Sequence, residues 1–199
     1  MIATNRNRHQ VFSGLLLAGL LAVMPTTAWS LELQTVLENT RITPPDRVAF
    51  REERHNQLLK EPLLLTGYLE YLGDGRLRKV VETPFQESFL IEAGRIEVER
   101  DGKTRKLRIS KSKSLRVMLA GIEAVLAGQS DKLESVFAYE LSGTERSWSL
   151  QLKPLSRKVA KQLSGLLIKG DDNSLLSIRF DLQGGEWHQM DILNDEQEQ

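Results

Sequence analysis

The chain of 199 residues contains no cysteine. Disulfide bonds therefore cannot stabilise it, and the thiolate ligands of structural zinc sites are missing. The lack of cysteine also removes the thiol that a lipid anchor would need. We expect a protein that is stabilised by its hydrophobic core and is soluble rather than lipid-anchored.

The chain also lacks an excess of charge of one sign. Its 27 basic and 27 acidic residues give a formal net charge of +0 at pH 7. Such a balance provides no field that would steer the protein to nucleic acid or to an anionic membrane. We therefore predict that nucleic acid is not a partner.

Recognised catalytic motifs are missing as well. The chain has no Gly-x-Ser-x-Gly elbow, no phosphate-binding glycine loop and no His-Glu-x-x-His motif. His55 and His188 are the only histidines beyond residue 30, and they lack the spacing of a metal site. Glu52 and Glu53 lie between arginines, which is typical of a charged strand face rather than an acid/base pair. We predict no catalytic residue, no metal, no cofactor and no enzymatic activity.

The first thirty residues differ in composition from the rest. A basic start is followed by an apolar run at 11–23 and by small residues at Ala28 and Ser30. This pattern predicts a secretory signal peptide over residues 1–30, cleaved after Ser30. A membrane anchor is the alternative, but the run is shorter than the ~20 residues that a spanning helix needs. The segment holds two basic residues and no acid, so its removal leaves 25 basic against 27 acidic residues, a net charge of −2.

Alternation of apolar and polar residues dominates the segment 67–109. A period of two places the apolar side chains on one face of a pleated strand and the charged ones on the other. Turn signals separate the alternating runs, at Gly73-Asp74-Gly75, Pro84, Ala93-Gly94 and Asp101-Gly102. The pattern predicts an antiparallel meander with one apolar face and one charged face.

The remaining segments extend this sheet and add helices. Further strands are expected at 48–59, 62–72, 147–152, 162–169, 174–182 and 187–193, and helices or helical turns at 31–42, 111–128, 131–137 and 154–160. About ten antiparallel strands in one sheet tend to curl. We predict a single domain at 31–199, mainly β with helices, built as an unclosed antiparallel β-barrel.

The helix at 111–128 has an unusually thin polar face. Leucine, isoleucine, valine and methionine recur at three- and four-residue spacing, and Arg116 and Glu123 are the only charges between Leu115 and Gln129. Such a helix is buried on most of its circumference or covers a large apolar surface. We expect it to lie as a lid or plug on the concave side of the curved sheet.

One set of positions forms a pattern of glycine, proline and aliphatic residues: Gly67, Leu69, Tyr71, Leu77, Thr83-Pro84-Phe85, Glu87 to Ile91, Gly94, Ile96 and Val98, with Phe50, Arg54, Leu58, Leu59 and Pro62 before them. This pattern resembles the LolA family, the periplasmic carriers of outer-membrane lipoproteins. The resemblance implies an unclosed β-barrel whose apolar concavity is covered by helices and accepts acyl chains. Aliphatic residues replace the aromatic ones typical of the family, and the strand at 76–83 carries extra basic charge, so the cargo stays open.

The resemblance also implies which residues contact the cargo. The expected lipid-binding residues are Leu69, Leu77, Phe89, Ile91, Ile96, Val98, Leu115, Met118, Leu119, Ile122, Trp148, Leu150, Ile178 and Phe180. The alternative for each is an ordinary core position. Arg54 resembles a family arginine that holds the lid closed by hydrogen bonds to the helices; its alternative is a solvated surface charge.

The resemblance therefore predicts a monomeric periplasmic carrier that takes lipoproteins from an inner-membrane exporter to an outer-membrane acceptor. An acyl chain gains about 0.8 kcal/mol for each CH₂ that leaves water, so an apolar cavity can hold it without chemistry. The alternatives are a carrier of a free lipid or of a long acyl or polyene product, and a non-catalytic envelope adaptor that binds protein at a sheet edge.

Overall fold

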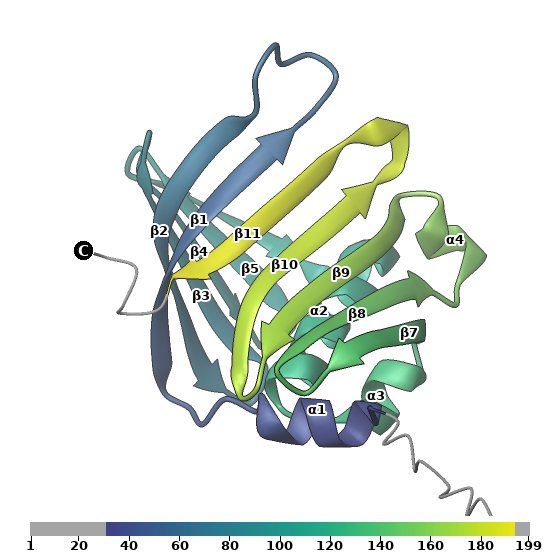
Figure 1. The fold of residues 1–199 in the computed structure, drawn as a ribbon. Helices are drawn as coiled ribbons and strands as arrows, with labels where there is room; N and C mark the ends of the chain where they lie inside the picture. The colour runs from purple at the N-terminus through teal and green to yellow at the C-terminus, as the bar shows by residue number, and fades with distance from the viewer. Residues whose placement is uncertain (1–30, 194–199) are drawn as a thin grey trace, which may run out of the picture. The chain divides into compact units, whose positions relative to one another are not determined.

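The computed structural model describes residues 31–193, which form one eleven-stranded antiparallel sheet with helices (Figure 1). The predicted signal peptide at 1–30 lies outside the described residues. The strands are β1 Asp46–His55, β2 Leu63–Gly73, β3 Arg76–Thr83, β4 Glu87–Glu92, β5 Arg95–Arg100, β6 Lys103–Arg108, β7 Phe137–Thr144, β8 Ser147–Pro154, β9 Leu163–Asp171, β10 Ser174–Leu182 and β11 Trp187–Leu193. The helices are α1 Leu33–Asn39, α2 Lys113–Leu126, α3 Ser130–Glu134 and α4 Arg157–Ala160, with 3₁₀ turns η1 Ile109–Lys111 and η2 Gln183–Gly185.

The sheet consists of two meanders that meet at one pair of strands. Its order is β6-β5-β4-β3-β2-β1-β11-β10-β9-β8-β7, so every pair except β1–β11 joins consecutive strands. Within residues 31–193, the outermost strands β6 and β7 pair on one side only, and the sheet is not closed. The unclosed antiparallel architecture expected from the sequence is confirmed, with eleven strands rather than about ten.

The turns between the strands explain the meander from β2 to β6. Three of its hairpins turn on two residues, at Asp74-Gly75, Ala93-Gly94 and Asp101-Gly102, and φ is positive at both positions of each. That geometry matches the right-handed twist of the flanking strands and favours glycine at the second position. The alternating pattern and the turn signals therefore predicted this half of the sheet correctly.

The prediction for residues 131–144 was wrong in part. We expected a helix to Phe137 and no strand after it, but α3 ends at Glu134 and Phe137 begins β7. Most of β7 is exposed because it is an outermost strand, with Phe137 buried and Leu141 half-buried. Phe137, Tyr139 and Leu141 do alternate with neighbours that include Glu140 and Ser142, but Phe137 had been assigned to the preceding helix, so the strand was not predicted. In the middle of the sheet, β1 ends at His55 rather than at residue 59.

Two hydrophobic clusters stabilise the domain. In the larger one, α1, α3 and the C-terminal part of α2 pack on β7 to β10. The smaller one contains five buried residues from β1, β2, β3 and β11: Phe50, Leu65, Val81, Met190 and Ile192. In Figure 1, α2 lies inside the curve of the sheet, behind β9 and β10. None of the helices in 31–193 has the length and apolar character needed to cross a membrane.

Candidate functional site: a cavity beneath helix α2

Helix α2 is anchored at its C-terminal half and less covered at its N-terminal half. Gly121 and the run 124–126 are buried, whereas Leu115, Met118 and Leu119 are half-buried. The helix begins at a capping residue, because the Ser112 side chain accepts a hydrogen bond of 3.2 Å from the Leu115 N–H. The less buried half of the helix supplies three residues of the cavity lining, although Met118 also packs against the larger hydrophobic cluster.

The anchored half depends on a close contact at Gly121. A Cβ atom at this position would lie 2.6 Å from Cε2 of Phe137, which is fully buried on β7. No real Cβ contact is that short, so only glycine lets the helix approach the strand at this point. Gly121 therefore determines where α2 rests on the sheet.

A cavity of about 400 Å³ lies between the N-terminal half of α2 and the sheet. This volume is within the range of small-molecule sites, which is about 300–1,000 Å³. Its apolar lining contains eleven of the residues expected to bind lipid: Leu69, Leu77, Phe89, Ile91, Ile96, Leu115, Met118, Leu119, Ile122, Ile178 and Phe180. Leu182 and Met190 add apolar surface that the sequence analysis did not single out. Side chains from β2 to β5, from β10 and β11, and from α2 thus meet around one space.

Three residues expected in this lining lie elsewhere. Trp148 and Leu150 are buried in the larger hydrophobic cluster, because β8 lies beneath the helices rather than beside the cavity. Val98 is half-buried on β5, between Phe89 and Arg105 in the register of the sheet, and is not among the residues that line the cavity. These three residues lie on the apolar face of their strands, but that part of the face does not line the cavity under α2.

Two smaller cavities adjoin the first. One of about 310 Å³ lies between α2 and the β2–β3 and β4–β5 turns, and one of about 190 Å³ lies between α2, the residues after α1, and the sheet. Leu77 and Ile122 line all three cavities. These two side chains therefore lie where the three spaces adjoin.

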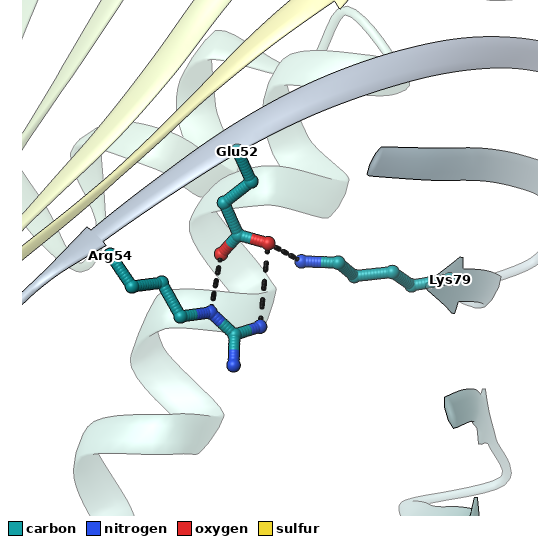
Figure 2. A network of polar contacts seen from close by, with 3 residues as sticks. All are labelled: Glu52, Arg54 and Lys79. Atoms are coloured by element: carbon teal, nitrogen blue, oxygen red, sulfur yellow. Dashed lines mark hydrogen bonds and ion pairs between the residues drawn. The ribbon is translucent and has the colours of Figure 1, made fainter. Parts of the chain in front are cut away.

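Three charged residues line the main cavity and contact one another, as Figure 2 shows. The Glu52 carboxylate accepts hydrogen bonds from Arg54 Nε at 2.9 Å and Arg54 Nη2 at 3.3 Å, and a third from Lys79 Nζ. The Glu52 side chain is only 4% exposed, Lys79 16% and Arg54 26%. We call these three residues the ion cluster. Its ions are buried in a largely apolar lining, where each depends on its partners.

Burial and ion pairing act in opposite directions on the ion cluster. Burial raises the pKa of Glu52, but the positive charges of Lys79 and Arg54 outweigh burial and hold the pKa below its ordinary value of 4.5. Burial lowers the pKa of Lys79, and Glu52 offsets this only in part. Burial, and then the charge of Arg54, lowers the pKa of His188 below 6.5, so this neighbouring imidazole is neutral at pH 7.

Arg54 differs from what the family resemblance led us to expect. Among residues 31–193, both of its hydrogen bonds go to Glu52 on the same strand, and neither goes to a helix. The reason is local, since a carboxylate two residues away on the same face of β1 accepts both bonds. Arg54 nevertheless lines the cavity beneath α2. A role for it in gating the lid remains a proposal, and would act through Glu52.

The sequence did contain a signal for the ion cluster. Lys79 shares the parity of Leu77 and Val81, and Glu52 shares that of Phe50, so both charges lie on an apolar strand face. We interpreted Glu52 as part of a charged, solvated face, and the structure places it in the cavity lining. The pairing could not be predicted because Glu52 and Lys79 lie on different strands, separated by β2.

The architecture and the cavity define an unclosed antiparallel half-barrel with a helix over an apolar cavity. The chain matches the family described as outer membrane lipoprotein carrier protein LolA-like over residues 25–194. It therefore belongs to this LolA-like family. No curated protein sequence matches the chain.

The chain is also similar to three solved bacterial structures of low sequence identity. A putative outer membrane lipoprotein-sorting protein domain from Vibrio parahaemolyticus is 13% identical, with 81% of this chain and 90% of that chain covered and a TM-score of 0.45. A LolA superfamily protein from Nitrosomonas europaea is 13% identical, with 83% and 93% covered and a TM-score of 0.44. The lipoprotein LppX from Mycobacterium tuberculosis is 10% identical, with 81% and 93% covered and a TM-score of 0.41.

Proposed function

We propose that this protein is a non-catalytic periplasmic carrier that holds acyl chains in the cavity beneath α2. The apolar cavity of about 400 Å³ is the observation that supports this most directly. Each CH₂ group moved from water into such a lining gains about 0.8 kcal/mol. A chain of ordinary lipid length would therefore be retained without a covalent bond or a cofactor.

Loading and release would occur by movement of the N-terminal half of α2. Leu115, Met118 and Leu119 face the cavity and are only half-buried, so their displacement exposes less apolar surface than displacement of the anchored half would. Methionine adapts its shape to irregular neighbours, which suits a surface that contacts different guests. The C-terminal half stays packed on β7 and serves as the fixed end of the lid.

Membership of the LolA-like family supports a proposed direction of transport. A LolA-like carrier would receive lipoproteins from an inner-membrane exporter and deliver them to an outer-membrane acceptor, as a monomer that is exported by the signal peptide at 1–30. Energy for loading would come from the membrane partner, because the sequence contains no nucleotide-binding motif. The second candidate cargo is a free lipid or acyl product, and the charges inside the cavity favour it.

Extraction of the purified protein with organic solvent, followed by mass spectrometry, tests this proposal. A diacylated peptide in the extract would identify lipoprotein cargo, and a free lipid would identify the second candidate. A titration with a fluorescent fatty acid provides the parallel binding measurement. An empty extract together with no uptake of the probe would exclude both cargoes and leave an adaptor that binds protein at the outermost strands.

The variant Leu119→Glu locates the binding site. It places a charge in the apolar lining, and we expect uptake of the fluorescent fatty acid to weaken at least about tenfold. Lys113→Glu on the exposed start of the same helix is the matched control and should bind like the wild type. Equal uptake by wild type and Leu119→Glu would show that the chain binds elsewhere.

A further inference from the structure

The ion cluster carries more positive than negative charge. Lys79 and Arg54 are two cations, and Glu52 is the one acid that lines the cavity with them. His188 lines the same cavity and is neutral at pH 7, because burial lowers its pKa. The ion cluster therefore has a net charge of about +1 when Glu52, Lys79 and Arg54 are all charged.

Nearby charges outside the cavity do not cancel this excess. Glu87 on β4 also attracts Lys79, but it lies 3.9 Å from Arg100 and forms an ion pair with it. Glu186 precedes β11 and acts on His188, and it does not line the cavity either. The excess positive charge belongs to Lys79 and Arg54.

Hydrogen-bonding capacity gives the same result as charge. The ammonium of Lys79 and the guanidinium of Arg54 have more N–H donors than the two oxygens of Glu52 can accept. Within residues 31–193, Glu52 is the acceptor for every side-chain hydrogen bond of these two cations. A buried cation with donors to spare is stabilised most by an additional anion, since charge-assisted hydrogen bonds are the strong ones.

The surroundings of the ion cluster restrict what form that anion takes. Phe89, Met118 and Phe180 line the same cavity, and Lys79 Nζ lies 4.7 Å from the ring centre of Phe50. An ion with a full hydration shell would not fit such a lining favourably, whereas a charged group at the end of an apolar chain would. A single negative charge on the cargo would bring the net charge of the ion cluster to zero.

We propose that the cargo is a long acyl chain ending in a single carboxylate, which is bound by Lys79 and Arg54 while the chain lies beneath α2 toward Ile91 and Ile122. The proposal rests on the acyl-binding function above and favours a free acyl acid over a neutral lipid. Ile122 also lines both smaller cavities, which provides room for a chain longer than the main cavity holds.

Competition binding with matched probes tests the proposal. Palmitic acid, methyl palmitate and hexadecyl phosphate share one chain and differ in the head group, and each would displace a fluorescent fatty acid from the purified protein. We expect the acid to bind at least about tenfold more tightly than the ester, the gain of one charge-assisted hydrogen bond. We also expect the acid to bind more tightly than the phosphate, whose second charge exceeds the excess in the cavity.

Two variants connect this preference to the ion cluster. Lys79→Met removes the excess charge and leaves Arg54 paired with Glu52, so the acid and the ester should bind within about twofold of each other while binding of the ester is retained. Glu52→Gln leaves both cations and should increase the preference for the acid. Arg78→Met is the matched control on β3, because Arg78 pairs with Glu70 on the other face at 2.9 Å and should not change the preference.

The results separate failure of this inference from failure of the proposed function. No binding of any probe overturns acyl-chain binding itself. Binding of acid and ester with equal affinity leaves the carrier function in place and overturns the anionic subsite. A preference for the acid that survives in Lys79→Met also overturns it, and so does preferential binding of the phosphate. Thermal melts of each variant establish that it is folded, and Lys79→Gln replaces Lys79→Met if the latter does not fold.

Discussion

The side chain of Lys79 has an apolar environment around its stem and a charged partner at its end. In the register of the sheet it lies between Leu69 and Phe89, so its aliphatic stem is surrounded by apolar side chains. Its ammonium group reaches Glu52 across the strand that separates them and lies over the ring of Phe50. Long cationic side chains often place an apolar stem and a charged end in this manner. The charge is thus fixed by Glu52, and removing that carboxylate should affect the domain more than removing an exposed one.

The stability of the domain should depend on pH through Glu52. Its pKa is lowered by folding, so the folded state binds fewer protons than the unfolded state as the pH falls below 4.5. The stabilisation is therefore complete above pH 4.5 and is lost as the pH falls through the lowered pKa. In urea unfolding at a series of pH values, we expect the free energy of unfolding of Glu52→Gln to decrease less over this range than that of the wild type.

Glu53→Gln is the control for the pH series. Glu53 is adjacent in sequence, lies on the other face of β1 and pairs at 3.5 Å with the exposed Arg51. An exposed pair contributes about 0–1 kcal/mol, so its removal should leave the pH dependence close to that of the wild type. Identical pH profiles for Glu52→Gln and Glu53→Gln would contradict the role assigned to the buried carboxylate.

Ile122 lines the main cavity and the two smaller cavities, and we expect Ile122→Trp to block the passage between them. We expect this variant to bind a sixteen-carbon acid about tenfold more weakly, because excluding two methylenes from the lining costs roughly 1.6 kcal/mol. A ten-carbon acid, which needs less room, should bind nearly as it does to the wild type. Lys113→Trp on the exposed start of α2 is the control for added bulk. Equal weakening for both chain lengths would show that the cavities are not used in series.

Much of the cavity lining could be predicted from residue parity. Leu69, Phe89 and Ile96 lie where alternation and turn spacing placed them, because a period of two permits only two faces. Alternation does not indicate how far along the sheet a residue lies, so Trp148 could not be separated from the lining. Partners that meet across strands, such as Glu52 and Lys79, depend on a register that is set by the whole sheet.

At the scale of elements, helix α2 has two halves that differ in burial: the C-terminal half is buried, and the N-terminal half is less covered. We expect the backbone amides of 113–120 to exchange with deuterium faster than those of 121–126, since fewer buried contacts oppose opening there. Ser112→Ala removes the hydrogen bond that begins the helix, at a cost of about 0.5–2 kcal/mol, and should accelerate exchange in the first half selectively. A bound fatty acid should slow that exchange in both proteins.

Ser114→Ala provides the matched control for the exchange experiment. Ser114 lies in the first turn of α2 and bonds to the Gln162 side chain at 2.6 Å, without capping the helix. Uniform exchange along the whole helix, or equal acceleration in both serine variants, would contradict the division of α2 into two halves.

The contact between α2 and β7 should tolerate no added atom. Gly121→Ala forces a shift at Phe137, and overpacking of this kind typically costs about 1–3 kcal/mol in the free energy of unfolding. Phe137→Leu in the same chain vacates part of the ring and should restore some of that loss, as a double-mutant cycle in urea would measure. Additive effects of the two changes would show that the contact does not determine the position of the helix.

The same contact explains why β7 was difficult to predict. Its one fully buried side chain, Phe137, follows a helical pattern closely enough to be assigned to the preceding helix. Tyr139 and Leu141 share its parity, but they are exposed and half-buried because the strand lies at the edge of the sheet, so the alternation marks little buried surface. Helix α2, whose apolar residues recur over 14 residues, was predicted with nearly its observed limits.

At the scale of the whole domain, the cavity belongs to neither meander alone. Its walls come from β1 to β5 on one side and from β10 and β11 on the other, with α2 connecting the two halves of the chain. The β1–β11 pair, which aligns Phe50 with Ile192 and Arg54 with His188, is the only strand pairing that joins the two halves within residues 31–193. The geometry of the ion cluster and of the lining therefore depends on that pair.

The β1–β11 pair also has a consequence for how the protein folds. Every other strand pair joins neighbours along the chain and can form as soon as both strands are available, but the β1–β11 pair must wait for the last strand. Contacts between such distant segments carry the largest loop-closure cost and tend to form late. We expect the ability to bind a lipid to arise only when the last strand joins the first, so a partly folded chain would reach that step with its lipid site unformed.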